Sequence, residues 1–246
     1  MPYLKLFQLS LPTHGVFFLS GALLCLGLAR KRLEPRQFQA ALNSIPVATF
    51  YSLLGARLCY IAIHPDLWTT PQEWLQFWRG GMVSYGGLAG ALLGLLRGAH
   101  KAKLHPASYF DRLTPCLLAG WAIGRLGCFL TWFGEEGTPT QLRWAVTIAG
   151  SNYHPTLLYL SISLLALSAY CWYRPASNEG STAYIGATGF FILRALFDSF
   201  RVYHPIYLRT LSQAASVLLT ILLLWRWRQQ TWPAIPAVEK SSRAGR

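Results

Sequence analysis

Seven blocks of apolar residues divide the chain, and each block is long enough to cross a lipid bilayer as a helix. About 20 helical residues cover a hydrocarbon core of about 30 Å. The blocks predict spans over 12–29, 40–63, 82–99, 113–133, 155–173, 182–201 and 205–225. We therefore expect an all-α, polytopic integral membrane protein with about seven transmembrane helices. These helices would form one domain over residues 1–228, followed by a disordered cytoplasmic tail over 229–246.

The basic residues between the blocks predict how the chain is oriented. Lys and Arg gather after the first, third and fifth blocks and in the tail, whereas the other connections carry few. Because basic loops stay in the cytoplasm, we expect the N-terminus outside and the C-terminus cytoplasmic. The run Arg30, Lys31 and Arg32 follows the first block rather than preceding it, so that block is expected to remain as a span.

Composition agrees with a membrane protein and narrows the partners. Only 13% of the residues are charged and 53% are hydrophobic, whereas soluble domains carry about 25% charged residues. The net charge is +13, and the basic residues lie mainly between the apolar blocks. They therefore indicate topology and contact with the lipid bilayer rather than with nucleic acid. The five cysteines form no CxxC pair, and we expect neither a metal site nor a cofactor.

Charged side chains inside the predicted spans are the first sign of a functional site. Burying one at the bilayer centre costs at least about 2.5–3.5 kcal/mol, so such residues usually face a cavity or a partner. They are Arg57, Arg125, Arg194 and Asp198. All four lie in even-numbered spans, which run outward, and therefore in the outer half of the membrane. Three polar residues that open odd-numbered spans fall in the same half: His14, Tyr85 and His154.

Each of these residues also has a purely structural interpretation. Residues near span ends can extend to water, Arg57 can belong to a structural ion pair, and Arg194 can be neutralised by Asp198 four residues later. Arg125 has no acidic residue within helical reach. A buried guanidinium without an acid suits a phosphate, so we expect these arginines to hold a phospholipid head group.

Glycines recur in the third and fourth blocks. Gly86, Gly90, Gly94 and Gly98 are spaced by four residues, a pattern that lets helices approach closely. Close packing within one chain, packing between two chains and a wall for a narrow cavity all remain open from the sequence.

Ordered motifs resemble the prolipoprotein diacylglyceryl transferase family and extend over about residues 11–215. The motifs are Leu11-Pro12-Thr13-His14-Gly15, Gly55-Ala56-Arg57-Leu58, Gly80-Gly81-Met82-Val83-Ser84-Tyr85-Gly86-Gly87-Leu88, Gly124-Arg125-Leu126-Gly127-Cys128-Phe129, Tyr153-His154-Pro155-Thr156, Arg194 with Asp198 and Phe200-Arg201, and Leu211-Ser212-Gln213. The resemblance implies a seven-span enzyme of the bacterial cytoplasmic (inner) membrane with its active site facing the outer leaflet. Such an enzyme moves the diacylglyceryl group of phosphatidylglycerol onto the lipobox cysteine of a preprolipoprotein and releases glycerol phosphate.

The resemblance also implies roles for individual residues. Arg125 and Arg194 would bind the lipid phosphate and stabilise charge on the departing oxygen, Asp198 would orient Arg194, and Arg57 would add positive potential. Gly86, Gly87 and Cys128 would complete the substrate site. Candidate bases for the incoming thiol are His14, His154 and Tyr85. Imidazole titrates near neutral pH whereas a phenol ordinarily titrates near about 10, so we expect Tyr85 to position or hydrogen-bond the substrate.

The chain departs from the family pattern at four of these positions. Tyr85 replaces the histidine of the usual His-Gly-Gly, His14 replaces a common tyrosine, Cys128 replaces asparagine, and Asp198 replaces glutamate. Two other hypotheses therefore stand beside the leading one. The chain could be a related enzyme with another acceptor or donor, or a non-enzymatic phospholipid binder or transporter.

Overall fold

The computed structural model describes residues 3–6, 9–64, 67, 72, 74, 76, 80–131, 137–148, 150–174, 178–202 and 207–231. Within them the helices are α1 (Thr13–Arg32), α2 (Pro35–Ile63), α3 (Ser84–Lys101), α4 (Pro106–Thr131), α5 (Thr156–Tyr173), α6 (Ser181–Asp198) and α7 (Tyr207–Thr231). The strands β1 (Tyr3–Leu6) and β2 (Leu9–Pro12) form one antiparallel hairpin, and β3 (Val146–Ile148) and β4 (Ser151–Tyr153) form another.

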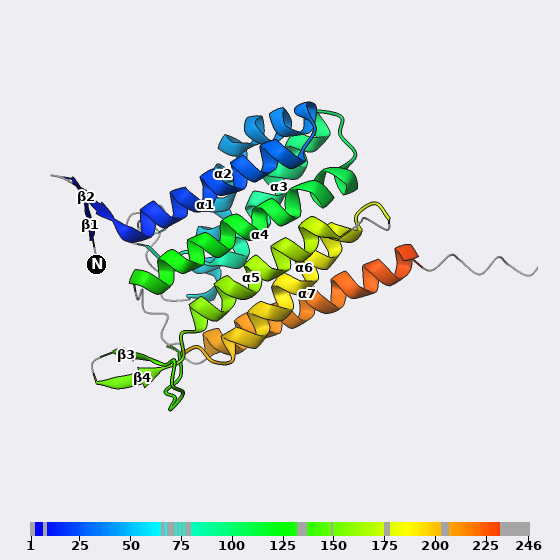
Figure 1. Ribbon diagram of the computed structural model, residues 1–246. Helices are drawn as coiled ribbons and strands as arrows, with labels where there is room; N and C mark the ends of the chain where they lie inside the picture. The colour runs from blue at the N-terminus through cyan, green and yellow to red at the C-terminus, as the bar shows by residue number, and fades with distance from the viewer. Residues whose placement is uncertain are drawn as a thin grey trace, which may run out of the picture.

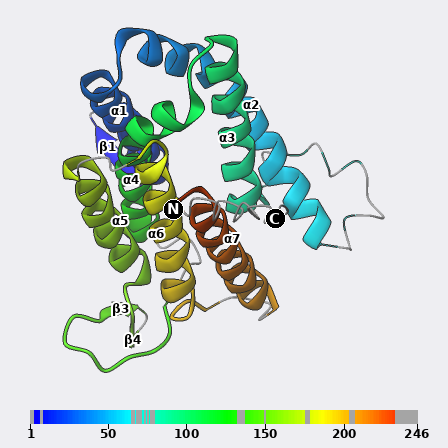
Figure 2. The ribbon, with the colours of Figure 1, turned by 90° about the vertical axis from the view of Figure 1, so that its right-hand side faces the viewer.

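The helices lie side by side, and successive helices run in opposite directions (Figure 1). α2, α4 and α6 end where α1, α3, α5 and α7 begin, and the β3–β4 hairpin lies at this end, which we call the hairpin end. The α2–α3 pair stands at one side of the bundle in the view of Figure 2, with α5 at the other.

Glycine contacts set the distance between α2 and α3. A Cβ added to Gly86 would overlap the carbonyl of Gly55, and one added to Gly90 would overlap the carbonyl of Tyr51. Gly94 and Gly98 lie in the same way against Ala48 and Ser44 of α2. The glycine stripe of α3 therefore packs within one chain, which answers the question that the spacing left open.

Gly90→Ala should destabilise the protein by about 1–3 kcal/mol, because the added methyl group meets backbone that cannot move aside. The matched control is Gly27→Ala in α1, where a Cβ would meet nothing within 4 Å. That change should leave stability unchanged or raise it by up to about 1 kcal/mol, because alanine favours helix. Thermal unfolding in detergent measures both, and equal effects would show that the α2–α3 contact is not tight.

Two apolar clusters fill the interior on either side of α4. One joins α1 to α4 through residues that include Ala29 and Cys116, and the other joins α4, α5 and α6 through residues that include Leu164 and Phe190. Buried serines add hydrogen bonds between helices: Ser161 donates to the Ala122 carbonyl at 2.8 Å, and Ser168 donates to the Pro115 carbonyl at 2.7 Å. In lipid such bonds stabilise helix pairs, because an unpaired hydroxyl there is costly.

The helical multi-pass fold is confirmed, and the helix ends refine the predicted spans. In the described residues, five helices are long and apolar enough to cross a membrane: α1, α2, α4, α5 and α7. Arg194 and Asp198 lower the apolar content of α6, and α3 is rich in glycine. The number of helices that cross the membrane and the orientation of the chain stay predictions.

Polar turns explain why several helices extend beyond their apolar blocks. α2 begins at Pro35 rather than near residue 40, because Glu34 and Gln37 form a capping box and proline suits the first helical turn. α4 begins at Pro106 rather than near residue 113. α7 continues to Thr231, so the tail predicted for 229–246 starts with helical residues, and 232–246 lie outside the described residues.

Candidate functional site

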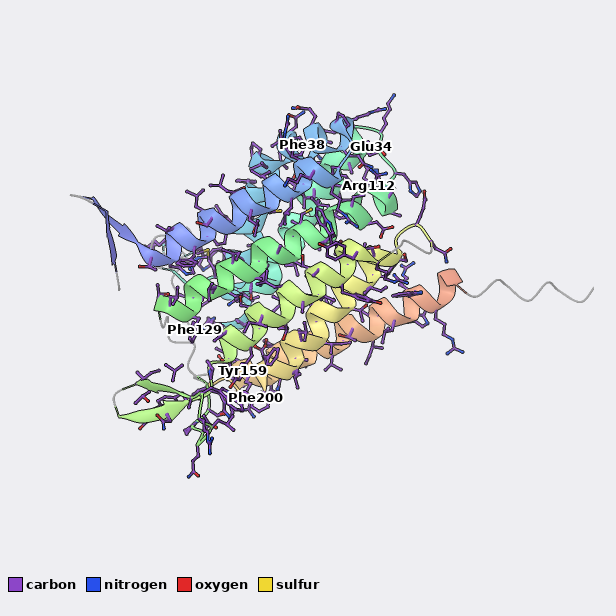
Figure 3. The ribbon with its side chains drawn as sticks, viewed as in Figure 1. Glu34, Phe38, Arg112, Phe129, Tyr159 and Phe200 are labelled. Atoms are coloured by element: carbon purple, nitrogen blue, oxygen red, sulfur yellow. The ribbon has the colours of Figure 1, made fainter. Side chains whose placement is uncertain are left out.

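The candidate residues gather toward the hairpin end of the bundle. Arg57, Arg125 and Arg194 lie in the last two turns of α2, α4 and α6, while His14 and Tyr85 lie in the first turn of α1 and α3. Figure 3 labels Phe129, Tyr159 and Phe200 at this end, and Glu34, Phe38 and Arg112 at the other. The convergence that the sequence suggested is therefore seen in the structure, whereas the membrane face on which it lies stays a prediction.

Arg194 is the centre of a buried polar cluster. Its side chain is 6% exposed. The guanidinium donates from Nε to the Tyr85 hydroxyl at 3.0 Å and from Nη2 to Ser84 Oγ at 3.1 Å. It also lies over the Tyr85 ring, with Cζ 4.8 Å from the ring centroid. The start of α3 thus fixes both the position and the plane of the guanidinium.

Asp198 joins this cluster to α7. Its Oδ2 accepts a hydrogen bond of 2.5 Å from Ser212 Oγ and lies 3.8 Å from Arg194 Nε, while its Oδ1 lies 3.5 Å from Arg201 Nη1. All these side chains are buried. One carboxylate therefore faces two guanidinium groups, and it links the end of α6 to α7 through Ser212.

Arg125 lies on α4 at the level of Arg194. Trp121 and Phe190 meet edge to face with ring centroids 5.5 Å apart, and α4 and α6 run in the same direction. Arg125 and Arg194 each follow this contact by four residues, so they share one level of the bundle. Arg125 is half-buried, with Cζ 5.6 Å from the Trp121 ring centroid.

His14 and Cys128 form a pair beside Arg125. Cys128 is three residues beyond Arg125 on α4, and its Sγ lies 3.6 Å from His14 Nδ1 of α1. A Cβ on Gly127 would overlap Phe17, so this glycine lets α1 approach α4 here. The imidazole is thereby placed within about one helical turn of a candidate phosphate ligand.

Arg57 has a different environment from the one predicted for it. Its Nε donates to the Trp74 carbonyl at 3.0 Å, and its Nη1 donates to the carbonyls of Gly80 and Gly81 at 2.7 and 3.0 Å. Gly80 and Gly81 have φ values of 80° and 73°, which only glycine adopts readily. Arg57 therefore holds the connection between α2 and α3, rather than presenting these donors to a ligand.

Arg57→Gln should release this connection and speed proteolytic cleavage between α2 and α3 by about tenfold, because three hydrogen bonds from a cation are lost. Binding of phosphatidylglycerol should change less than threefold if Arg125 and Arg194 hold the phosphate. Limited proteolysis and lipid binding on the same sample separate the two effects. A large loss of binding with unchanged cleavage would return Arg57 to the lipid site.

The other predicted residues, His154, Gly86 and Gly87, lie at the hairpin end of the bundle. His154 precedes α5, with its ring centroid 5.3 Å from Phe200 and 6.2 Å from Tyr159. Its backbone N–H donates to the Thr138 carbonyl at 3.0 Å, so it anchors the segment beside the hairpin. Gly86 packs on Gly55, and a Cβ on Gly87 would meet only ordinary contacts with α2. Within the described residues, no three His, Cys, Asp or Glu side chains converge as metal ligands.

Three serines belong to the polar cluster without having been given a role from the sequence: Ser84 and Ser212, which occurred only within motifs, and Ser216, which was not named. Ser212 and Ser216 are four residues apart on α7, and both are buried. The Tyr85 hydroxyl lies 3.0 Å from Ser212 Oγ and 2.6 Å from Ser216 Oγ. The sequence did contain a sign of this cluster, because Ser212 and Ser216 place two hydroxyls on one face of an otherwise apolar helix.

A cavity of about 550 Å³ opens at the end opposite the hairpin end, where α1 ends and α6 begins. Several of its polar side chains bind backbone groups or side chains outside the cavity. Asp111 accepts the N–H groups of Gly180 and Ala183 at 2.6 and 2.8 Å, and Arg112 pairs with Glu34 at 2.9 Å. The contacts at this end stabilise the start of α6 and the α1–α2 turn.

Comparison with known proteins links this arrangement to one family. The family model described as prolipoprotein diacylglyceryl transferase matches residues 2–228. A phosphatidylglycerol–prolipoprotein diacylglyceryl transferase of Bordetella parapertussis is 31% identical over 183 residues, covering 69% of each chain. Its namesake in Parasynechococcus marenigrum is 32% identical over 174 residues, covering 65% of this chain and 62% of its own. Another from Clostridium novyi is 30% identical over 170 residues, covering 64% and 66% respectively.

Proposed function

The chain belongs to the prolipoprotein diacylglyceryl transferase family, and we propose that it transfers the diacylglyceryl group of phosphatidylglycerol to the lipobox cysteine thiol of a preprolipoprotein. Glycerol phosphate would leave. The protein is a multi-pass membrane enzyme, a transferase. We place it in the bacterial cytoplasmic (inner) membrane with the hairpin end toward the outer leaflet, because the more basic connections lie at the opposite end.

The observation that carries this proposal is the pair of arginines at one level of the bundle. Arg194 is held by Ser84, Tyr85 and Asp198, and Arg125 lies at the same height on the parallel helix α4. A lipid phosphodiester bound between them would contact two guanidinium groups that are already in position before the lipid binds. Preorganised donors of this kind stabilise charge that develops during reaction.

The proposed transfer breaks one bond for each bond that it forms and needs no additional reactant. The acceptor thiol gives its proton to a base, and the resulting thiolate attacks the glyceryl carbon of the lipid that carries the phosphate. A carbon–sulfur bond forms while the carbon–oxygen bond to phosphate breaks, and the electron pair stays on the leaving phosphate oxygen. Arg125 and Arg194 would stabilise the negative charge on that oxygen.

His14 is the base that this geometry favours. The Tyr85 hydroxyl is already engaged by Arg194 and by two serines, and His154 lies between Phe200 and Tyr159 beside the hairpin. His14 lies next to Cys128, three residues beyond Arg125. An imidazole nitrogen there lies beside the proposed site of the reacting phosphate.

The proposal is tested with purified protein, labelled phosphatidylglycerol and a lipobox peptide. We expect the label on the peptide cysteine, and no label when the cysteine is replaced by serine. Absence of transfer, under conditions in which a relative from Bordetella parapertussis is active, would refute the proposed function.

A related enzyme with another acceptor or donor is the second candidate. It is motivated by the departures at His14, Tyr85 and Cys128, which all lie at the hairpin end. Peptides with other nucleophiles and vesicles with other anionic phospholipids, assayed in parallel, distinguish it. Label on one of these in place of the lipobox thiol would favour the second candidate.

A further inference from the structure

Ser216 places a hydroxyl in the most enclosed part of the polar cluster. It lies on α7 and is 0% exposed, while its neighbours along the helix are largely apolar. Its Oγ is 2.6 Å from the Tyr85 hydroxyl. An unpaired hydroxyl is costly at such a position, so this hydrogen bond determines how both side chains are oriented.

The hydrogen bonds around Tyr85 can be assigned because a phenol has one proton to donate. The Ser212 carbonyl at 2.9 Å can only accept, whereas Arg194 Nε at 3.0 Å can only donate. The hydroxyl proton of Ser212 goes to Asp198. The Tyr85 proton therefore points to Ser212, and Ser216 is the hydroxyl left to donate to the phenol oxygen.

We propose that Ser216 is a positioning residue, which acts through Tyr85 to set the direction in which Arg194 presents its guanidinium to the lipid phosphate. Ser216 holds the phenol oxygen from one side, and that oxygen accepts from Arg194 Nε on the other. Once Nε is committed to Tyr85 and Nη2 to Ser84, the plane of the guanidinium is fixed. This inference rests on the proposed function for the identity of the anion.

The chain of contacts crosses three helices, from α7 through α3 to α6. Nothing in it requires Ser216 to touch the lipid. Loss of the Ser216 hydroxyl should therefore weaken lipid binding only when Tyr85 and Arg194 are both present to transmit it. A serine that only helps α7 to pack would weaken the protein in any background.

The test is a pair of double-mutant cycles measured as binding of phosphatidylglycerol in nanodiscs of otherwise zwitterionic lipid. Ser216→Ala should weaken binding by about tenfold, as expected for losing one buried hydrogen bond in a charged network. In the Tyr85→Phe and Arg194→Lys backgrounds, the same change should alter binding by less than about twofold. The proposal would be overturned if Ser216→Ala weakened binding by the same factor in either background as in the wild type. It would also be overturned if Ser216→Ala alone left the affinity unchanged.

Ser168→Ala is the matched control, because Ser168 is also buried and donates one hydrogen bond of 2.7 Å, to Pro115 on α4. It should leave binding within about twofold while lowering the unfolding temperature about as much as Ser216→Ala. Equal losses of binding in the two variants would assign Ser216 a packing role only. Lipid binding that follows the predicted cycles without any transfer to a lipobox peptide would refute the proposed function and leave the positioning role standing.

Discussion

Arg125→Ala is expected to lower the rate of diacylglyceryl transfer by about 10²–10³, the range found when one preorganised donor to a developing anion is removed. Arg125 lies over Trp121 at the height of Arg194. Without it, the leaving phosphate oxygen would face one guanidinium instead of two. Transfer of labelled diacylglyceryl to a lipobox peptide, at saturating phosphatidylglycerol, measures the change in kcat.

The control for this prediction lies on the same helix. Arg112 of α4 pairs with Glu34 at 2.9 Å at the opposite end of the bundle, and both side chains are substantially exposed. Arg112→Ala removes the same charge from α4 and should change transfer less than twofold, because exposed ion pairs contribute little. If Arg125→Ala loses no more activity than Arg112→Ala, Arg125 does not bind the phosphate.

Apolar block length was enough to predict the helices, because a helix in lipid must satisfy its own backbone hydrogen bonds. It could not give the helix ends, since ends such as Pro35 are set by polar caps outside the apolar blocks. The β3–β4 hairpin was also missed. Its strands are three residues each, too short to show an alternating pattern.

Charge inside the spans led correctly to one end of the bundle, but it did not separate the roles of the arginines. Arg57 and Arg194 were both predicted from the sequence to lie at the lipid site. In the structure Arg57 donates to loop carbonyls, whereas Arg194 donates to side chains of α3 and is linked to α7 through Tyr85. The difference comes from which groups the fold packs around each side chain, and residue type does not encode that.

The four departures from the family motifs form one contacting pair and one pair that shares its partners. His14 lies against Cys128 at 3.6 Å. Tyr85 and Asp198 both hold Arg194 and both contact Ser212. A change at one position of a contacting pair alters the space and the donors available to the other. In the sequence the same four positions are far apart, so these contacts could not be predicted from it.

His14→Gln should lower transfer at neutral pH by about 10², the lower end of the range for removing a general base. The pH dependence of the variant is set by ionisation of the acceptor thiol. A free cysteine thiol ionises near about pH 8.5, so the variant should regain activity as the pH rises toward 9, where the thiolate forms without help. The wild type should depend less on pH over that interval, because the proposed base removes the thiol proton during the reaction.

His154→Gln is the comparison that makes this prediction specific to one histidine. Both residues lie at the hairpin end, but His154 lies among Tyr159, Phe200 and the backbone of the hairpin segment. Its variant should keep the pH profile of the wild type even if the rate falls. A profile that turns alkaline-dependent in His154→Gln and not in His14→Gln would move the base to His154. The contact between His14 and Cys128 would then serve to orient the start of α1 beside Arg125.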